Sequence, residues 1–185
     1  SSYDRTVKCW DAASGQLLKS LESHTQAVND VCLSREGRRA LSASFDRTVK
    51  VWKIPSGEWI RDLSGHTSFV DAVSFSPDGR YALSGSGNAE VKKWDIESGE
   101  CVQELRGSTK SIKSAAISHS GRMGLTGDIG GLIRLWDLSN GRCLRTLVSG
   151  KGQQFEVCWG NDDRRVFTAV YDNVIQIWQI GKPED

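Results

Sequence analysis

The sequence predicts an all-β protein built from a repeated unit of 42 residues, each unit folding into four short strands. Five of the seven tryptophans recur at this spacing, namely Trp10, Trp52, Trp94, Trp136 and Trp178, and a constant period of this length indicates a repeat architecture. Apolar and polar residues alternate with a period of two, as in residues 48–52 (TVKVW), which is typical of half-buried strands. No window of about 10–12 residues carries a helical stripe of apolar residues, which excludes parallel βαβ folds.

Two further columns of residues keep the same 42-residue step. Glycines at tight turns form one column: Gly15, Gly57, Gly99 and Gly141. Arginines that follow a turn form the other column: Arg38, Arg80, Arg122 and Arg164. Coincidence does not place several independent residue types in one register, so the repeat extends along the whole chain.

Three turns divide each unit into its four strands. Residues 76–80 (SPDGR) predict the first turn, because Pro77 fixes one φ angle and Gly79 accepts a left-handed one. Residues 44–47 (SFDR) predict the second turn, and residues 55–58 (PSGE) predict the third. Corresponding turn residues in the other units give the same succession of strands.

Residues 24–53 (HTQAVNDVCLSREGRRALSASFDRTVKVWK) and 66–95 (HTSFVDAVSFSPDGRYALSGSGNAEVKKWD) share an opening His, the glycine turn, a Ser-rich strand and a closing Trp. With these features the chain resembles the WD-repeat (Trp-Asp repeat) family over essentially its whole length. The resemblance implies a β-propeller, in which each unit forms one four-stranded antiparallel blade around a central channel. Two segments, SPDGR and GRRALSAS, also resemble units of bacterial WD-repeat proteins, in which such blades often extend signalling kinases or NTPases.

The repeat divides the chain into one propeller domain that is expected to be partial. Residues 1–23 supply the last half of a blade, and residues 151–185 supply a blade that lacks its last strand. Complete blades are expected at residues 24–65, 66–107 and 108–150. Propellers of the family usually have about seven blades, whereas this chain supplies about four blades and a part of another. We therefore expect an incomplete ring, an open arc with exposed strand edges.

In the family, a His, a Ser or Thr, an Asp and a Trp form a buried hydrogen-bonded tetrad in each blade. The resemblance carries this role to His24, Ser42, Asp46 and Trp52 in one blade, and to His66, Ser84, Asn88 and Trp94 in the next. A half-buried indole N–H needs an acceptor, and an imidazole can bridge a carboxylate to a hydroxyl. Because the Ser-His-Asp set recurs in equivalent places, we interpret it as structural and not as a catalytic triad.

The third and fourth blades depart from this pattern. In the third blade, Ser108 and Gly130 stand where the His and the Asp belong. The fourth blade keeps Asp172 but has Gly150 at the position of the His. The third blade thus keeps only Thr126 and Trp136, and the fourth blade lacks the His, so we expect these two blades to be less firmly held.

Charge and cysteine content argue against several classes of function. The 24 Lys and Arg residues balance 23 Asp and Glu residues, for a net charge of +1, which argues against a dominant field for nucleic acid. We expect no membrane span, because no apolar run approaches the required length. Five cysteines without a C-x-x-C pair predict no metal site and no cofactor, and the equivalent Cys101 and Cys143 are expected to be small core residues. An odd number of cysteines without an N-terminal leader favours the reducing cytoplasm.

In the family, partner contacts concentrate on one face of the propeller, at three positions in each blade. The resemblance assigns a partner-binding role here to Tyr3, Asn29, Phe45, Phe69, Asp71, Lys113, Phe155 and Tyr171. Five of these are Phe or Tyr, out of eight in the chain, and exposed aromatic residues beside charges are typical of interface hot spots. The alternative interpretation is that some of the rings pack into the channel or against a neighbouring blade.

We therefore interpret the chain as a protein–protein interaction scaffold that presents a propeller face to a peptide or protein partner, as part of a larger signalling or regulatory protein. An enzyme that uses the channel mouth is one alternative, although no acid–base pair or unique nucleophile supports it. Anion or nucleic-acid binding along the rim of repeated arginines is another, which the balanced charge weakens. Exposed strand edges would also allow edge-to-edge self-association.

Overall fold

The computed structural model describes residues 2–149, 154–170 and 174–181, with only the backbone of residues 154 and 155. These residues form strands and turns and no helix. The first eight strands are β1 (Thr6–Trp10), β2 (Leu17–Glu22), β3 (Val28–Leu33), β4 (Arg39–Ser44), β5 (Thr48–Lys53), β6 (Glu58–Ser64), β7 (Val70–Phe75) and β8 (Tyr81–Ser86). The others are β9 (Val91–Asp95), β10 (Cys101–Leu105), β11 (Ile112–Ile117), β12 (Met123–Asp128), β13 (Leu132–Asp137), β14 (Cys143–Val148), β15 (Gln154–Trp159), β16 (Arg165–Val170) and β17 (Val174–Gln179).

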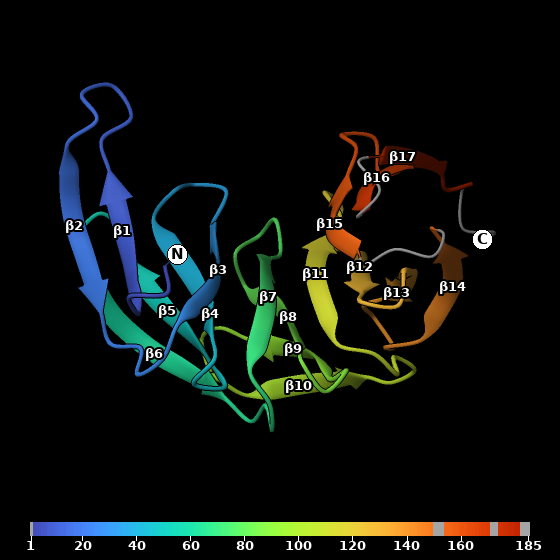
Figure 1. The fold of residues 1–185 in the computed structure, drawn as a ribbon, viewed down its shortest axis with the longest axis horizontal. Coiled ribbons are helices and arrows are strands. Elements are labelled where there is room, and N and C mark those ends of the chain that lie inside the picture. The colour runs from blue at the N-terminus through green and yellow to red at the C-terminus, as the bar shows by residue number, and fades with distance from the viewer. Residues whose placement is uncertain (1, 150–153, 171–173, 182–185) are drawn as a thin grey trace.

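The strands form five sheets that follow one another in an arc (Figure 1). Three are four-stranded antiparallel sheets in simple order, β3-β4-β5-β6, β7-β8-β9-β10 and β11-β12-β13-β14. The two-stranded sheet β1-β2 lies at one end of the arc, and the three-stranded sheet β15-β16-β17 lies at the other. Strands β3, β7, β11 and β15 line the inner side and contact one another in sequence. The predicted all-β fold of propeller blades in an incomplete ring is therefore confirmed.

One backbone hydrogen bond recurs in four sheets and shows that each is built in the same register. In each case the N–H two residues after the repeated Trp donates to the carbonyl of the repeated Arg, over 2.6–2.9 Å. The pairs are Ile54–Arg38, Ile96–Arg80, Leu138–Arg122 and Ile180–Arg164. This bond ties the end of the third strand to the turn between the first two strands.

The repeated tryptophans and leucines form the core between neighbouring sheets. The three tryptophans of the four-stranded sheets, Trp52, Trp94 and Trp136, are at most 1 % exposed, and Leu41 and its equivalents are completely buried. Full burial of one leucine side chain stabilises the fold by roughly 1.5–3 kcal/mol. Trp10 is 56 % exposed, because β1 pairs only with β2 and no second strand covers its inner edge.

In each of the three complete blades, a buried cation links the third strand to a carboxylate. In the first two complete blades the carboxylate lies on the outer strand, with Lys50 Nζ 2.7 Å from Asp62 Oδ1 and Lys92 Nζ 2.7 Å from Glu104 Oε1. In the third blade the outer strand has Thr146 at this position, and the carboxylate comes from the second strand instead. Arg134 and Asp128 form this pair.

Asp128 also organises the turn of the third blade, which lacks the His and the Asp of the motif. It is completely buried, and its Oδ2 lies 2.7 Å from Arg134 Nη1. Its Oδ1 accepts hydrogen bonds from the backbone N–H groups of Gly130 and Leu132, at 2.9 and 3.1 Å. The third blade therefore contains a different set of contacts at the place where the tetrad residues are missing.

The expectation that Cys101 and Cys143 are core residues is wrong. Both thiols are exposed at the start of an outer strand. Strand alternation alone does not reveal this, because the outer strand of a blade lies at the periphery of the arc, where neither of its faces is fully covered.

Replacing Asp128 with Ala is expected to lower the free energy of unfolding by about 3–5 kcal/mol, because the Arg134 guanidinium would stay buried without its partner. Urea denaturation followed by tryptophan fluorescence measures the change. Arg106→Ala is the matched control, since its ion pair with Glu104 is exposed and should contribute at most about 1 kcal/mol. Equal losses in the two variants would show that the Asp128–Arg134 pair does not stabilise the third blade.

Candidate partner-binding face

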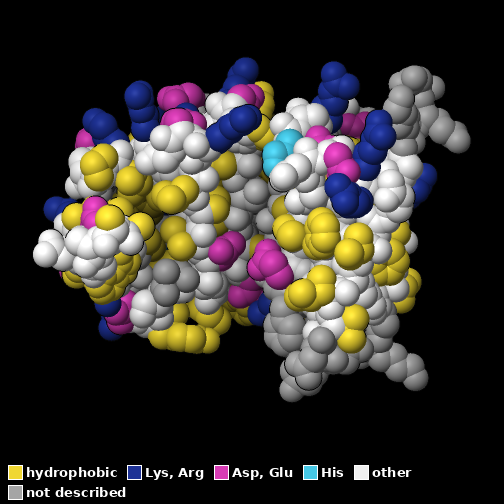
Figure 2. All heavy atoms as spheres, turned by 90° about the horizontal axis from the view of Figure 1, so that it is seen from above, with side chains coloured by type: hydrophobic (Ala, Val, Ile, Leu, Met, Phe, Trp, Pro, Cys, Tyr) yellow, Lys and Arg dark blue, Asp and Glu magenta, His cyan; other side chains and the backbone are white. Residues whose placement is uncertain are grey.

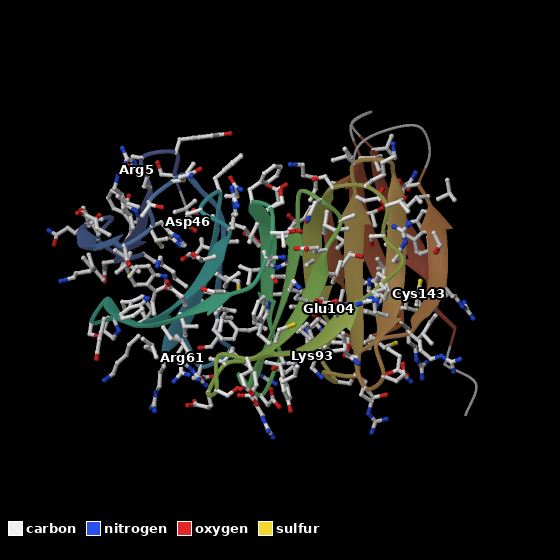
Figure 3. The ribbon with its side chains drawn as sticks, turned by 90° about the horizontal axis from the view of Figure 1, so that it is seen from below. Arg5, Asp46, Arg61, Lys93, Glu104 and Cys143 are labelled. Carbon is white, nitrogen blue, oxygen red and sulfur yellow. The ribbon has the colours of Figure 1, made fainter. Side chains whose placement is uncertain are left out.

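The strands of every blade run between two faces of the arc. We call the upper face the one formed by the turns between second and third strands (residues 44–47 in the first complete blade) and the loops that enter each blade. The lower face carries the turns between first and second strands, such as residues 76–80. In Figure 3, Arg5 and Asp46 lie toward the upper face, and Arg61 and Lys93 lie toward the lower face.

The predicted tetrad of the first complete blade comes together just beneath the upper face. His24 Nδ1 lies 2.7 Å from Asp46 Oδ2, and His24 Nε2 lies 2.7 Å from Ser42 Oγ. Trp52 Nε1 donates to the same Ser42 Oγ over 2.8 Å. An ionised Asp46 accepts the proton of Nδ1, so Nε2 accepts from the Ser42 hydroxyl and the chain of donors is complete. The four residues thus connect the entry loop, β4, its following turn and β5.

Asp46 remains ionised in this setting. Burial raises the pKa of its carboxyl group, but hydrogen bonds from His24 and Thr48 outweigh that effect and hold the pKa well below its ordinary value. The backbone N–H of Thr25 adds a further donor at 3.0 Å. Hydrogen bonds that favour the charged form have this effect in general.

In the second complete blade the prediction for Asn88 is wrong, and Glu90 takes its place. His66 Nε2 lies 2.6 Å from Ser84 Oγ, and Trp94 Nε1 donates to Ser84 over 2.8 Å, as expected. His66 Nδ1, however, contacts Glu90 Oε2 at 3.1 Å. Asn88 is exposed and donates to Thr67 Oγ1 instead. The longer side chain of Glu90 reaches the imidazole from two residues further along.

Glu90 also reproduces the second contact of Asp46, because its Oε2 accepts the backbone N–H of Thr67 at 3.0 Å. Burial raises the pKa of Glu90, but this N–H, the Thr67 hydroxyl and His66 lower it to about 2. Burial lowers the pKa of His66 below its ordinary value despite the nearby Glu90 carboxylate. The second blade thus holds a neutral imidazole against an ionised carboxylate.

Among the described residues, the other two blades share the bond between the indole and the hydroxyl. Trp136 Nε1 donates to Thr126 Oγ1 over 2.8 Å, and Trp178 Nε1 donates to Thr168 Oγ1 over 3.1 Å. The predicted positions 150 and 172 of the fourth blade lie outside the described residues.

A second repeated backbone bond brings the predicted partner-binding positions together on the upper face. The N–H of the residue just after the second strand donates over 2.9 Å to a carbonyl in the loop that enters the same blade. The pairs are Phe45–Ala27, Gly87–Phe69 and Ile129–Ser111. Side chains of the turn and the entry loop therefore lie beside each other in every complete blade.

Five of the eight predicted partner-binding residues form one connected group, which we call the aromatic–ionic cluster: Asn29, Phe45, Phe69, Asp71 and Lys113. The rings of Phe45 and Phe69 stack with centroids 4.8 Å apart. Lys113 Nζ lies 5.8 Å from the centroid of Phe69 and 2.7 Å from Asp71 Oδ2. Asn29 Nδ2 donates to Asp71 Oδ1 over 3.0 Å. The cluster joins three successive blades.

Gly87 explains how the ring of Phe69 fits between two turns. A Cβ atom at Gly87 would lie only 2.2 Å from the ring, so any other residue there would displace it. The equivalent positions in the neighbouring blades hold the large side chains of Phe45 and Ile129. Both rings of the stack are half-buried, so the cluster combines packing with exposure.

The remaining predicted residues are not part of this cluster. Tyr3 is 86 % exposed and lies at the turn before β1. The side chain of Phe155 and the whole of Tyr171 lie outside the described residues. Their partner-binding role stays a prediction.

Sequence reasoning missed two acidic residues on the inner strands. Asp30 on β3 accepts the backbone N–H of Val73 on β7 over 2.9 Å, and Glu156 lies on β15. Burial raises the pKa of both carboxyl groups, and the charge of Asp30 raises that of Glu156 further. Figure 2 shows acidic side chains in the hollow at the centre of the arc. The 42-residue spacing was the available signal, because both residues fall in one column.

The repeated arginines lie on the lower face and are exposed. Acidic side chains are interspersed with them. In Figure 2 the lower face is at the top of the picture, and acidic and basic side chains are mixed along that edge. Arg80 Nε, for example, lies 3.2 Å from Asp95 Oδ2. The described ranges contain no cluster of three or more His, Cys, Asp or Glu residues suited to a metal ion. Nor do they contain a helix with the length and apolar character needed to cross a bilayer.

Replacing Glu90 with Gln is expected to lower the free energy of unfolding at neutral pH by about 1.5–3 kcal/mol, because His66 and Thr67 lose a charged acceptor. Asn88→Ala is the matched control at the position that the motif indicated. Its exposed contacts should contribute less than about 1 kcal/mol. Thermal and urea denaturation measure both effects, and a larger loss in Asn88→Ala would reverse the assignment.

Acid is expected to destabilise the fold in two stages. The lowered pKa of His66 means that the unfolded chain takes up this proton first, so stability falls as the pH drops below 6.5, the ordinary pKa of a histidine. The ionised Glu90 carboxylate stabilises the fold fully above pH 4.5, and this contribution is lost as the pH falls toward about 2. Urea titrations between about pH 7 and pH 3 test this order. In Glu90→Gln the second stage should become shallower, and an unchanged slope would contradict the assignment.

Comparison with known proteins agrees with this architecture. Residues 15–53, 57–95 and 99–137 match the family model described as WD domain, G-beta repeat. Each matched stretch ends one residue after a repeated Trp, so it runs from the outer strand of one blade to the third strand of the next.

Three curated relatives are similar over short stretches. Lissencephaly-1 homologs from Monosiga brevicollis and Caenorhabditis briggsae are 49 % and 47 % identical over 39 and 38 residues, covering 21 % and 20 % of this chain. The nuclear distribution protein PAC1-2 of Uncinocarpus reesii (strain UAMH 1704) is 46 % identical over 43 residues, covering 23 % of this chain. The matches span only 9–10 % of the relatives' own lengths. None of these organisms is a bacterium, so the resemblance to bacterial units stays a prediction. The family model itself covers more than half of the chain, which therefore belongs to the WD-repeat family.

Proposed function

We propose that this WD-repeat protein is a protein-interaction scaffold whose partner binds the upper face at the aromatic–ionic cluster. The observation that carries the proposal is the stack of Phe45 and Phe69 beside the Asp71–Lys113 ion pair. Aromatic residues and partly desolvated charges that gather at one place supply most of the free energy in protein interfaces. The partner is a peptide or a folded protein that covers this cluster.

The internal contacts of the cluster support a preorganised surface. Asn29 and Lys113 both contact Asp71, so the carboxylate is held in one orientation before a partner arrives. Phe69 is fixed between Phe45 and Gly87. Groups that are already ordered lose less conformational entropy on binding, which increases affinity.

Catalysis by the Ser-His-Asp sets has little support. Ser42 and Ser84 are completely buried, and each hydroxyl already accepts a hydrogen bond from an indole N–H. A nucleophile needs access to its substrate, so these serines hold the blade together. Binding of nucleic acid along the arginine rim also has little support, because acidic side chains are interspersed with the arginines.

The proposal places the scaffold in the cytoplasm as part of a larger signalling or regulatory protein. All five cysteines are unpaired, which fits a reducing compartment. A role in signalling rests only on the resemblance between its blades and those of multidomain proteins.

Replacing Phe45 with Ala is expected to weaken the binding of partner proteins to the immobilised chain, because the stack on Phe69 would be lost and the upper face would lose an apolar anchor. Quantitative mass spectrometry of the retained proteins, followed by titration with each purified candidate, measures the effect. A loss of affinity of about tenfold or more is expected.

Trp59→Ala is the matched control. This aromatic residue is 50 % exposed, but it lies on the outer strand β6 and away from the cluster. This variant should still bind the partner proteins. Both variants should remain folded in the assay, which their denaturation midpoints will show. If Phe45→Ala retains its partners as well as Trp59→Ala does, the upper face is not the binding site.

A further inference from the structure

The lower mouth of the central channel carries a second apolar surface, far from the aromatic–ionic cluster. The last residue of each inner strand is large and apolar in all four blades: Leu33, Phe75, Ile117 and Trp159. Leu33 is 61 % exposed, whereas Phe75 is 9 % exposed. A single exposed Leu is ordinary, but an exposed Leu that continues into a ring of apolar side chains marks an interaction site.

A hollow of about 380 Å³ opens at this mouth, large enough for one or two side chains of a ligand. Leu33, Phe75 and Ile117 line it from three successive inner strands, together with Pro77. Ser76 and Ser118 also line it, but the turns at these residues already use their hydroxyl groups as hydrogen-bond partners. The surface that remains for a ligand is therefore mainly apolar.

The charges at the edge of this hollow indicate the chemistry of the occupant. Arg35 lines it, is exposed and forms no ion pair with any of the described residues. His119 lies at the opposite side, with Nδ1 3.3 Å from Asp163 Oδ1. The Asp163 carboxylate is already bound by the backbone N–H groups of His119 and Ser120. Asp78 is likewise bound within its own turn, to Ser76 and Arg80. An unpaired cation beside an apolar hollow is complementary to an apolar side chain with a neighbouring carboxylate.

We propose that the lower mouth binds a short acidic–apolar segment of a partner protein. Its apolar side chain occupies the hollow between Leu33, Phe75 and Ile117, and an adjacent carboxylate pairs with Arg35. This site lies at the opposite end of the inner strands from the aromatic–ionic cluster. The scaffold can then hold two partners at once, one on each face.

Fluorescence anisotropy with three labelled eight-residue peptides tests the proposal on the whole chain. The first peptide has Leu-Phe at its centre and glutamates on both sides, the second has lysines in place of the glutamates, and the third has Ser-Ser in place of Leu-Phe. The first peptide is expected to bind about tenfold or more tightly than the other two, with an affinity that falls as salt rises. Equal binding of the acidic and basic peptides overturns the proposal.

Charge reversal separates this site from the other surfaces. Arg35→Glu should weaken binding of the acidic peptide about tenfold or more and favour the lysine peptide instead. Arg122→Glu is the matched control, because Arg122 is an exposed residue of the equivalent turn region and does not line the hollow. Both positions are exposed, so both variants should fold. If the two reversals have the same effect, general charge and not this site governs binding.

Two further measurements distinguish other occupants of the hollow. Phe45→Ala should leave binding of the acidic peptide unchanged, and a loss there would move the peptide to the upper face. Sedimentation velocity of the wild-type chain and of Leu33→Asp tests self-association. A dimer that Leu33→Asp dissociates, without peptide binding in the wild type, would overturn the proposal in favour of a second copy of the chain. If the peptide does not bind at the lower mouth, or if a second copy of the chain occupies it, the proposed function of the upper face is unaffected, because that function rests on other residues.

Discussion

The hydrogen bond from the repeated indole N–H to the hydroxyl of the second strand is the contact on which the other features of each blade depend. It occurs in four blades at 2.8–3.1 Å, with Ser as the acceptor in two blades and Thr in the other two. An indole brings a large apolar surface into the core but also one N–H that must be satisfied there. By accepting that N–H, the hydroxyl keeps the Trp buried and fixes the third strand against the second.

The same hydroxyl also orients the imidazole where one is present. Because Ser42 accepts from Trp52, its own proton is available to His24, and His24 then donates to Asp46. This sequence of donors reaches from the core to the turn that carries Phe45. The core thus fixes the position of the turn that carries Phe45, and with it this part of the aromatic–ionic cluster.

The blades use different carboxylates to accept the backbone N–H groups of their turns. What each turn needs is therefore an acceptor, and not one particular residue of the motif. Asp46 accepts the N–H of Thr48 in the first complete blade, over 3.1 Å. Asp128 accepts two N–H groups in the third, although it lies two residues before the position of the motif Asp. A carboxylate near the turn is needed to accept N–H groups that the ladder leaves unpaired. Which residue supplies it is open to substitution.

The repeat spacing made most of the fold predictable. The 42-residue period and the three turns in each unit predicted the number of strands, and the resemblance to the family predicted their arrangement in blades. The period also identified Trp52, Trp94 and Trp136, which occupy equivalent buried positions in the three four-stranded sheets. The resemblance to the family assigned Asn29, Asp71 and Lys113 to one face, and in the structure Asn29 and Lys113 both contact Asp71 there. Spacing could not reveal the role of Glu90, because the register gives the position of a residue in the repeat and not how far its side chain reaches. Nor could it reveal the stack of Phe45 on Phe69, which depends on the distance between blades and on the space that Gly87 leaves.

Contacts between neighbouring blades make the two faces parts of one rigid body. Asp30 on β3 accepts the N–H of Val73 on β7, and Ser74 on β7 accepts the N–H of Ile117 on β11 over 3.2 Å. Each inner strand is thereby joined to the next by a side chain and a backbone group about one repeat apart. These same strands carry Asn29, Asp71 and Lys113 of the aromatic–ionic cluster at one end and the apolar mouth at the other. Neither surface can therefore shift without breaking part-buried hydrogen bonds, each of which contributes about 1 kcal/mol. Partners on the two faces would therefore be held in a fixed relation to each other, which is the property that distinguishes a scaffold from a switch.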